Sequence, residues 1–120
     1  MPKPVKLLLL LLITLLGGWF RLQNLNWDQF HMYHPDERNI ANAVTKLNLP
    51  DKLDPGFHAY NGFFIYLTRF AAQNITQYTK DNIWTSDWGH IALISRYLSA
   101  TFSTLSLPLL LIILYCFFKP

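Results

Sequence analysis

The segment His34-Pro35-Asp36-Glu37-Arg38 lies between two apolar stretches of the chain, each of which could cross a membrane. Pro35 is well placed at the first position of a helix, because the N–H that proline lacks is unpaired there in any helix. Asp36 and Glu37 favour the positive N-terminal end of that helix. The acidic pair therefore has two interpretations: ordinary helix-start residues, or a reaction centre on the water side of a membrane.

The residues after this segment predict a helix over 35–47. Ile40, Val44 and Leu47 recur at helical spacing and give this helix one apolar face. A connection rich in proline, glycine and aspartate follows, which is typical of turns.

A second helix is expected over 61–78, with an apolar stripe along one side. The stripe is made of Tyr60, Phe63, Phe64, Leu67, Phe70, Ala71, Ile75 and Tyr78. Arg69 and Gln73 interrupt the apolar residues, so this helix is too short and too polar to cross a bilayer. It suits a helix that lies in the membrane interface, or one that packs against other parts of a larger protein.

The N-terminal stretch, from Pro4 to about Leu25, follows basic residues and is predicted to be a membrane-spanning helix. A cleaved signal peptide has the same basic and apolar order. Cleavage near Gly17 and Gly18 would place a leucine where a small residue is needed, which favours an uncleaved span. Trp19 suits the membrane interface.

The C-terminal stretch carries no charge from Tyr97 to Phe118 and predicts a second span. Small residues recur along it and indicate close packing against another helix: Ser99, Ala100, Ser103 and Ser106. Pro108 is expected to kink this helix. Two spans with a packing stripe and a kink are expected to be part of a bundle, and because the chain stops two residues after the second span, it is expected to be cut short.

Composition supports a membrane protein. Of the 120 residues, 52% are hydrophobic and only 14% are charged, whereas soluble domains carry about a quarter charged residues. The net charge of +3 is small and no basic cluster indicates nucleic acid. Cys116 has no cysteine to pair with in the chain. His31, His34, Asp36 and Glu37 could together offer metal ligands, but no zinc-site spacing such as HExxH is present, so no metal site is predicted.

The charges also predict a topology. All seven acidic residues lie between the two spans, while Lys3, Lys6 and Lys119 lie at the ends. The positive-inside rule then places both termini in the cytoplasm and the loop outside the plasma membrane. The expected organisation is an all-α membrane protein: a first transmembrane helix over 1–25, an extracytoplasmic loop with two amphipathic juxtamembrane helices over 26–90, and a second transmembrane helix over 91–120.

The order of these elements resembles the N-terminus of the type-C membrane glycosyltransferases. A first span is followed by His34-Pro35-Asp36-Glu37, then by Asp54-Pro55-Gly56 with Tyr60 and Gly62, and then by Arg96-Tyr97-Leu98-Ser99-Ala100 at the second span. The chain is most similar to the dolichyl-phosphate-mannose protein mannosyltransferase-like family, which includes the aminoarabinose transferases. The resemblance covers nearly all of this chain and only the N-terminal part of such an enzyme.

This resemblance implies transfer of a sugar from a polyprenyl-phosphate donor to an acceptor hydroxyl on the outer membrane face. In these enzymes an acidic residue of the first outer loop sits at the active site, and it maps onto Asp36, with Glu37 beside it as the second catalytic candidate. Arg38, Arg96 and Tyr60 are the candidates for substrate binding, although Asn39 stands where many relatives have an arginine. Such an enzyme is an inverting hexosyl or pentosyl transferase, and the resemblance leaves open whether it uses a divalent metal ion.

The partners expected from this resemblance are the lipid-linked sugar, membrane lipid and the further spans of the parent enzyme, without which the chain would be inactive. Two other classes of function fit the same sequence. The first is a non-enzymatic two-span membrane protein that binds a partner through its aromatic outer loop. The second is a secreted or anchored small domain behind a signal sequence.

Overall fold

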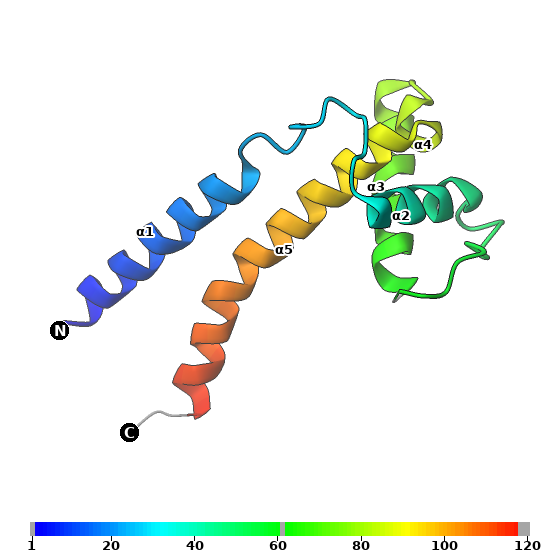
Figure 1. Cartoon of the computed structure of the whole chain (residues 1–120). Coiled ribbons are helices and arrows are strands. Elements are labelled where there is room, and N and C mark those ends of the chain that lie inside the picture. The colour runs from blue at the N-terminus through cyan, green and yellow to red at the C-terminus, as the bar shows by residue number, and fades with distance from the viewer. Residues whose placement is uncertain (1, 61, 118–120) are drawn as a thin grey trace. The chain divides into compact units, whose positions relative to one another are not determined.

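The computed structural model describes residues 2–60 and 62–117, and these residues form helices without any β-strand. The helices are α1 (Lys3–Leu22), α2 (Pro35–Lys46), α3 (Gly62–Thr79), the single turn α4 (Ile83–Ser86) and α5 (Trp88–Phe117), as Figure 1 shows. The all-helical prediction is therefore confirmed. α4 had no counterpart among the helices expected from the sequence.

Two of these helices, α1 and α5, are long and apolar enough to cross a membrane. Only 6% of the most apolar window of each helix is buried, whereas the core helix of a soluble protein would be mostly covered. The apolar side chains exposed on α1 and α5 therefore suit a lipid environment. α5 runs without interruption through Pro108.

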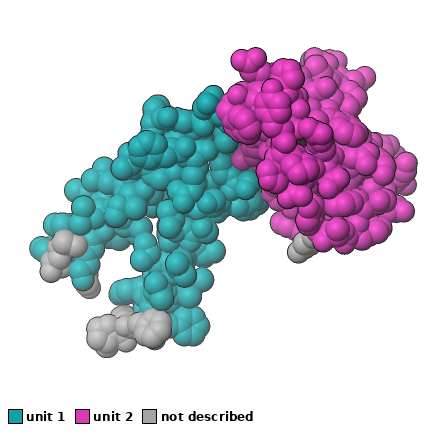
Figure 2. Space-filling model, viewed as in Figure 1, with its two compact units in different colours: residues 1–25, 97–120 teal, residues 26–96 magenta. Residues whose placement is uncertain are grey.

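The chain divides into two compact units, which Figure 2 colours separately. One unit contains residues 1–25 and 97–120, and the other contains residues 26–96. α5 contributes to both, with its first turns in the second unit.

In the first unit, α1 and α5 meet at small residues. A Cβ atom added to Gly18 would lie 3.0 Å from Thr104 Cγ2, and Arg21 Nε donates a 2.9 Å hydrogen bond to Ser103 Oγ. Of the predicted small-residue stripe, Ala100 is buried, whereas Ser99 and Ser106 are exposed. The contact with α1 therefore uses part of that stripe.

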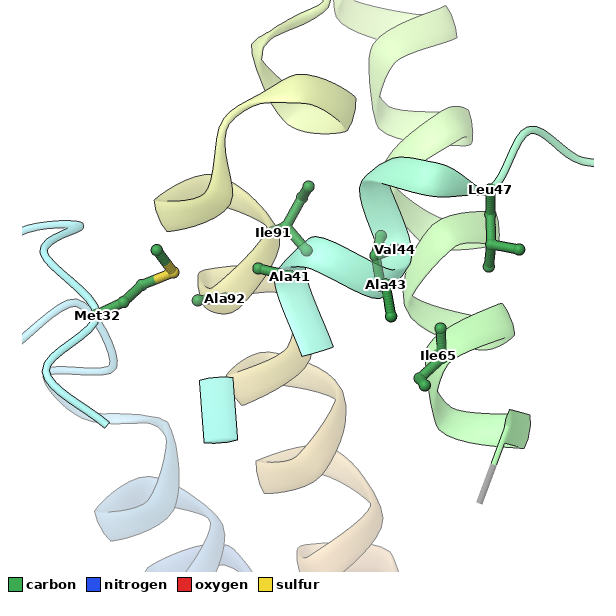
Figure 3. Close-up of a cluster of buried hydrophobic side chains, with 8 residues drawn as sticks. All are labelled: Met32, Ala41, Ala43, Val44, Leu47, Ile65, Ile91 and Ala92. Atoms are coloured by element: carbon green, nitrogen blue, oxygen red, sulfur yellow. The ribbon is translucent and has the colours of Figure 1, made fainter. Parts of the chain in front are cut away.

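The second unit has one hydrophobic core, shown in Figure 3. Its buried residues come from α2 and the residues on either side of it, from α3 and from the start of α5: Met32, Ala41, Ala43, Val44, Leu47, Ile65, Ile91 and Ala92. α2 starts with Pro35 at its first position, as the sequence indicates, and His34 Nδ1 accepts the backbone N–H of Asp36 at 3.3 Å. This cap and this core together fix the position of the acidic segment.

Polar side chains of α3 form hydrogen bonds with the segment after α2 and with α4. Gln73 exchanges two hydrogen bonds with the backbone of Leu49, at 3.1 and 3.0 Å. Arg69 is buried and donates to Thr85 O at 3.1 Å, which ties α4 to α3. Phe63 and Phe70 are 66% and 59% exposed. The buried side of α3 is thus the side that carries Arg69, and much of the predicted apolar stripe faces outward.

Candidate functional site

The two carboxylates in the first turn of α2 have different hydrogen-bond partners. Asp36 lies beside Tyr60, whose Oη donates a 2.6 Å hydrogen bond to Asp36 Oδ1. Glu37 lies beside Arg96, whose Nε and Nη2 donate to Glu37 Oε1 and Oε2 at 2.7 and 2.6 Å. Adjacent residues on a helix point about 100° apart, which explains why the pair separates.

Asp36 is the exposed member of the pair. Its side chain is 55% exposed, and the imidazole Nδ1 of His34 lies 3.8 Å from Asp36 Oδ2. The hydrogen bond to the Asp36 carboxylate raises the pKa of the Tyr60 hydroxyl, because ionised tyrosine would lose this bond and repel the carboxylate. Within the described residues, no lysine or arginine forms an ion pair with Asp36.

Arg96 holds a second carboxylate that sequence analysis did not single out. Its Nη1 donates to Asp28 Oδ1 at 2.8 Å, and its Nη2 also contacts Asp28 Oδ2. Asp28 is buried, and the hydrogen bond from Arg96 lowers the pKa of its carboxyl group from 3.8 to about 2. The guanidinium also lies over the ring of Trp27, 5.6 Å from the ring centroid.

The segment that contains Asp28 has an unusual backbone. Gln29, Phe30 and Met32 have φ values of 52°, 69° and 49°, in a region that costs non-glycine residues about 1–3 kcal/mol each and persists only where the surroundings enforce it. The Asp28 carboxylate contributes to this enforcement by accepting the backbone N–H of Met32 at 3.0 Å. Gly89 is required nearby, because an added Cβ would lie 2.6 Å from the carbonyl oxygen of Phe30.

Arg38, the remaining cationic candidate, is exposed and lies two residues after Asp36. Its Nε donates to the carbonyl oxygen of Met32 at 2.9 Å. The structure thus brings Asp36 together with Tyr60 and Glu37 together with Arg96, while Arg38 contacts the segment before α2. Asp28 was missed because no spacing rule connects it with Arg96, 68 residues away.

The histidines near the site have local roles. His34 caps α2, and His31 Nδ1 lies 2.8 Å from the carbonyl oxygen of Asp28. Across residues 2–60 and 62–117, no group of three or more histidine, cysteine, aspartate or glutamate side chains is placed to hold a metal ion.

Comparisons of the chain with protein-family models, with curated proteins and with solved structures find no match. The carboxylates of Glu37 and Asp28 are both occupied by the guanidinium of Arg96. The Asp36 carboxylate is exposed and, within the described residues, forms no ion pair with lysine or arginine, so it is the carboxylate that an acceptor hydroxyl can reach.

Proposed function

We propose that this chain is the N-terminal part of a type-C membrane glycosyltransferase in which Asp36 is the general base. The resemblance of the ordered motifs to this family suggests the reaction class. The observation that carries the proposal is the contrast between Asp36, which is exposed and hydrogen-bonded to Tyr60, and Glu37, which is held by Arg96.

In the proposed reaction, an acceptor hydroxyl attacks the anomeric carbon of a sugar on a polyprenyl-phosphate carrier. The hydroxyl proton passes to Asp36 as the new C–O bond forms. The bond between the anomeric carbon and the phosphate oxygen breaks, and its electron pair leaves with the lipid phosphate. Because Tyr60 occupies Oδ1, Oδ2 is the oxygen of Asp36 that would receive the proton.

The leaving phosphate needs positive charge nearby. Arg38 is exposed and, within the described residues, forms no ion pair with a carboxylate, so it is the better candidate of the two arginines. Arg96 is surrounded by two carboxylates, which reduces its attraction for an anion. In this proposal the loop over 26–90 faces outward from the plasma membrane, both termini are cytoplasmic, and α3 lies along the lipid surface.

The test is Asp36→Asn in the complete enzyme that contains this chain. Asparagine keeps the size and can accept a hydrogen bond, but it cannot take a proton. The transfer rate should fall by a factor of about 10²–10⁴, whereas a structural role in the first turn contributes only about 0.3–1 kcal/mol. A variant that is expressed normally and keeps more than about a tenth of the rate contradicts the base role. Asp51→Asn, which changes an exposed carboxylate, is the matched control.

A second function is favoured by one observation, the outward aromatic side of α3. Phe63, Phe70 and Tyr78 are all exposed there, and a two-span protein could bind a partner through them without any chemistry. Loss of partner binding in Phe63→Ser and Phe70→Ser, together with unchanged function in Asp36→Asn, would favour this alternative.

A further inference from the structure

Arg96 is shared between two carboxylates that come from distant parts of the second unit. Asp28 lies 68 residues before it and Glu37 lies 59 residues before it. The side chains of Arg96, Asp28 and Glu37 are 10%, 0% and 21% exposed. This cluster, named here the Arg96 cluster, therefore lies away from bulk water.

The Arg96 cluster is poorly suited to bind an anionic substrate. It contains one positive and two negative charges, and Nε, Nη1 and Nη2 all donate to carboxylate oxygens. A phosphate would have to displace a carboxylate that is already paired in a bidentate geometry. The charges are arranged to hold protein segments together.

The two carboxylates belong to segments that must be placed correctly for the site. Glu37 is in the first turn of α2, next to Asp36, and Asp28 starts the backbone segment with positive φ values. Asp28 Oδ2 also accepts the N–H of Met32, and Met32 O accepts from Arg38. One carboxylate thus connects α5, the segment before α2 and, through Arg96, the first turn of α2.

We infer that Asp28 is a positioning residue: with Arg96 it holds Glu37 and so sets the first turn of α2 at the place where Asp36 meets Tyr60. The structural part of this inference concerns only residues 26–96. Its consequence for sugar transfer rests on the proposed function.

The first arm of the test uses this chain in detergent micelles or nanodiscs. Tyrosine labelled with ¹³C reports the titration of Tyr60 by NMR. In Asp28→Asn, α2 should shift and the hydrogen bond to Asp36 should lengthen, so Tyr60 should titrate at lower pH than in the parent chain. Asp28→Glu, which keeps the charge, should restore part of the effect, and the control Asp51→Asn should leave the titration unchanged.

An unchanged titration of Tyr60 in folded Asp28→Asn overturns the inference. If Asp28→Asn does not fold, Arg96→Lys replaces it, because lysine keeps the positive charge but cannot hold two carboxylates in the same bidentate geometry. A lower titration of Tyr60 in Arg96→Lys supports the inference, and an unchanged titration contradicts it.

The second arm measures transfer by the complete enzyme. A displaced base should lower kcat by about tenfold to a hundredfold, while KM for the acceptor changes little. If Tyr60 titrates at lower pH but kcat is unchanged, the cluster does not position the reacting groups. If Asp36→Asn transfers sugar normally, the proposed function is wrong. The positioning role of Asp28 is then still decided by the titration of Tyr60 in the first arm.

Discussion

The Tyr60 hydroxyl donates a 2.6 Å hydrogen bond to Asp36, although 24 residues separate the two in the chain. Asp36 belongs to the first turn of α2, and Tyr60 precedes α3. Val44 of α2 and Leu47, the residue that follows α2, lie in the same hydrophobic core as Ile65 of α3, which brings these segments together. This hydrogen bond gives the exposed carboxylate of Asp36 a defined partner, and the bond can be detected directly.

The first prediction is that Asp36→Asn lowers the pKa of Tyr60. The Asp36 carboxylate holds this pKa above its ordinary value of 10.0, so a neutral amide should bring it down. The hydrogen bond therefore contributes to stability below about pH 10 and loses its contribution as the pH rises through the Tyr60 pKa. Titration of ¹³C-tyrosine by NMR measures the change, and equal titration in both chains would rule out the hydrogen bond.

The second prediction concerns acid stability. The pKa of Asp28 is lowered from 3.8 to about 2, so its ion pair stabilises the folded unit above about pH 4, and this contribution is lost as the pH falls toward 2. The linked stabilisation is roughly 2 kcal/mol. Thermal unfolding followed by circular dichroism at pH 5 and pH 2 should show a smaller difference for Asp28→Asn than for the parent chain. Parallel pH profiles would exclude the shifted carboxyl group.

The third prediction is that α3 lies on the membrane with its aromatic side toward lipid. Burying a large apolar side chain contributes roughly 1.5–3 kcal/mol, and Phe63 and Phe70 are exposed in the structure. In a Cys116→Ser background, nitroxide labels at either position should be relaxed more by oxygen than by a polar nickel complex. A label at Asp51 should show the reverse. Stronger relaxation by the nickel complex at all three positions would instead indicate that the aromatic side of α3 faces water or another protein.

The fourth prediction is the topology. Single cysteines at Asp51 and Lys80, again with Cys116→Ser, should react with an impermeant maleimide in intact cells. The expectation follows from the lysines near both chain ends and the acidic residues between the spans. Labelling that occurs only after lysis would place the loop inside.

The fifth prediction distinguishes the two neighbouring glycines of α1. A Cβ on Gly18 meets Thr104 Cγ2 at 3.0 Å, and Thr104 cannot rotate freely because its Oγ1 donates to Ala100 O at 2.8 Å. A Cβ on Gly17 comes closest to the flexible end of Arg21, at 2.9 Å. Gly18→Leu should therefore weaken the contact between α1 and α5, whereas Gly17→Ala should be tolerated and favours the helix.

Cross-linking measures this difference. Cysteines that replace Arg21 and Ser103, whose side chains touch in the structure, should be joined by a short bismaleimide. The yield should fall in Gly18→Leu and stay high in Gly17→Ala. Equal yields in the two variants would show that α1 and α5 do not pack through Gly18.

The sequence by itself determined the longer helices α1, α2, α3 and α5, but not the single turn α4. The predicted ranges 35–47 and 61–78 correspond to α2 over Pro35–Lys46 and α3 over Gly62–Thr79, and both apolar stretches form helices long enough to span a membrane. These features depend on hydrogen bonds within one turn and on apolar periodicity, which are local properties of the chain.

Only the tertiary structure decided which charges meet. The sequence shows Asp36 and Glu37 as one acidic pair, yet Glu37 accepts hydrogen bonds from Arg96, as does Asp28, while Asp36 accepts one from Tyr60. These contacts close loops of 24 to 68 residues. Their geometry depends on backbone angles at Gln29, Phe30 and Met32 that these residue types seldom adopt. A local sequence pattern cannot predict contacts between residues so far apart in the chain, because the packing of the whole unit decides which of them meet.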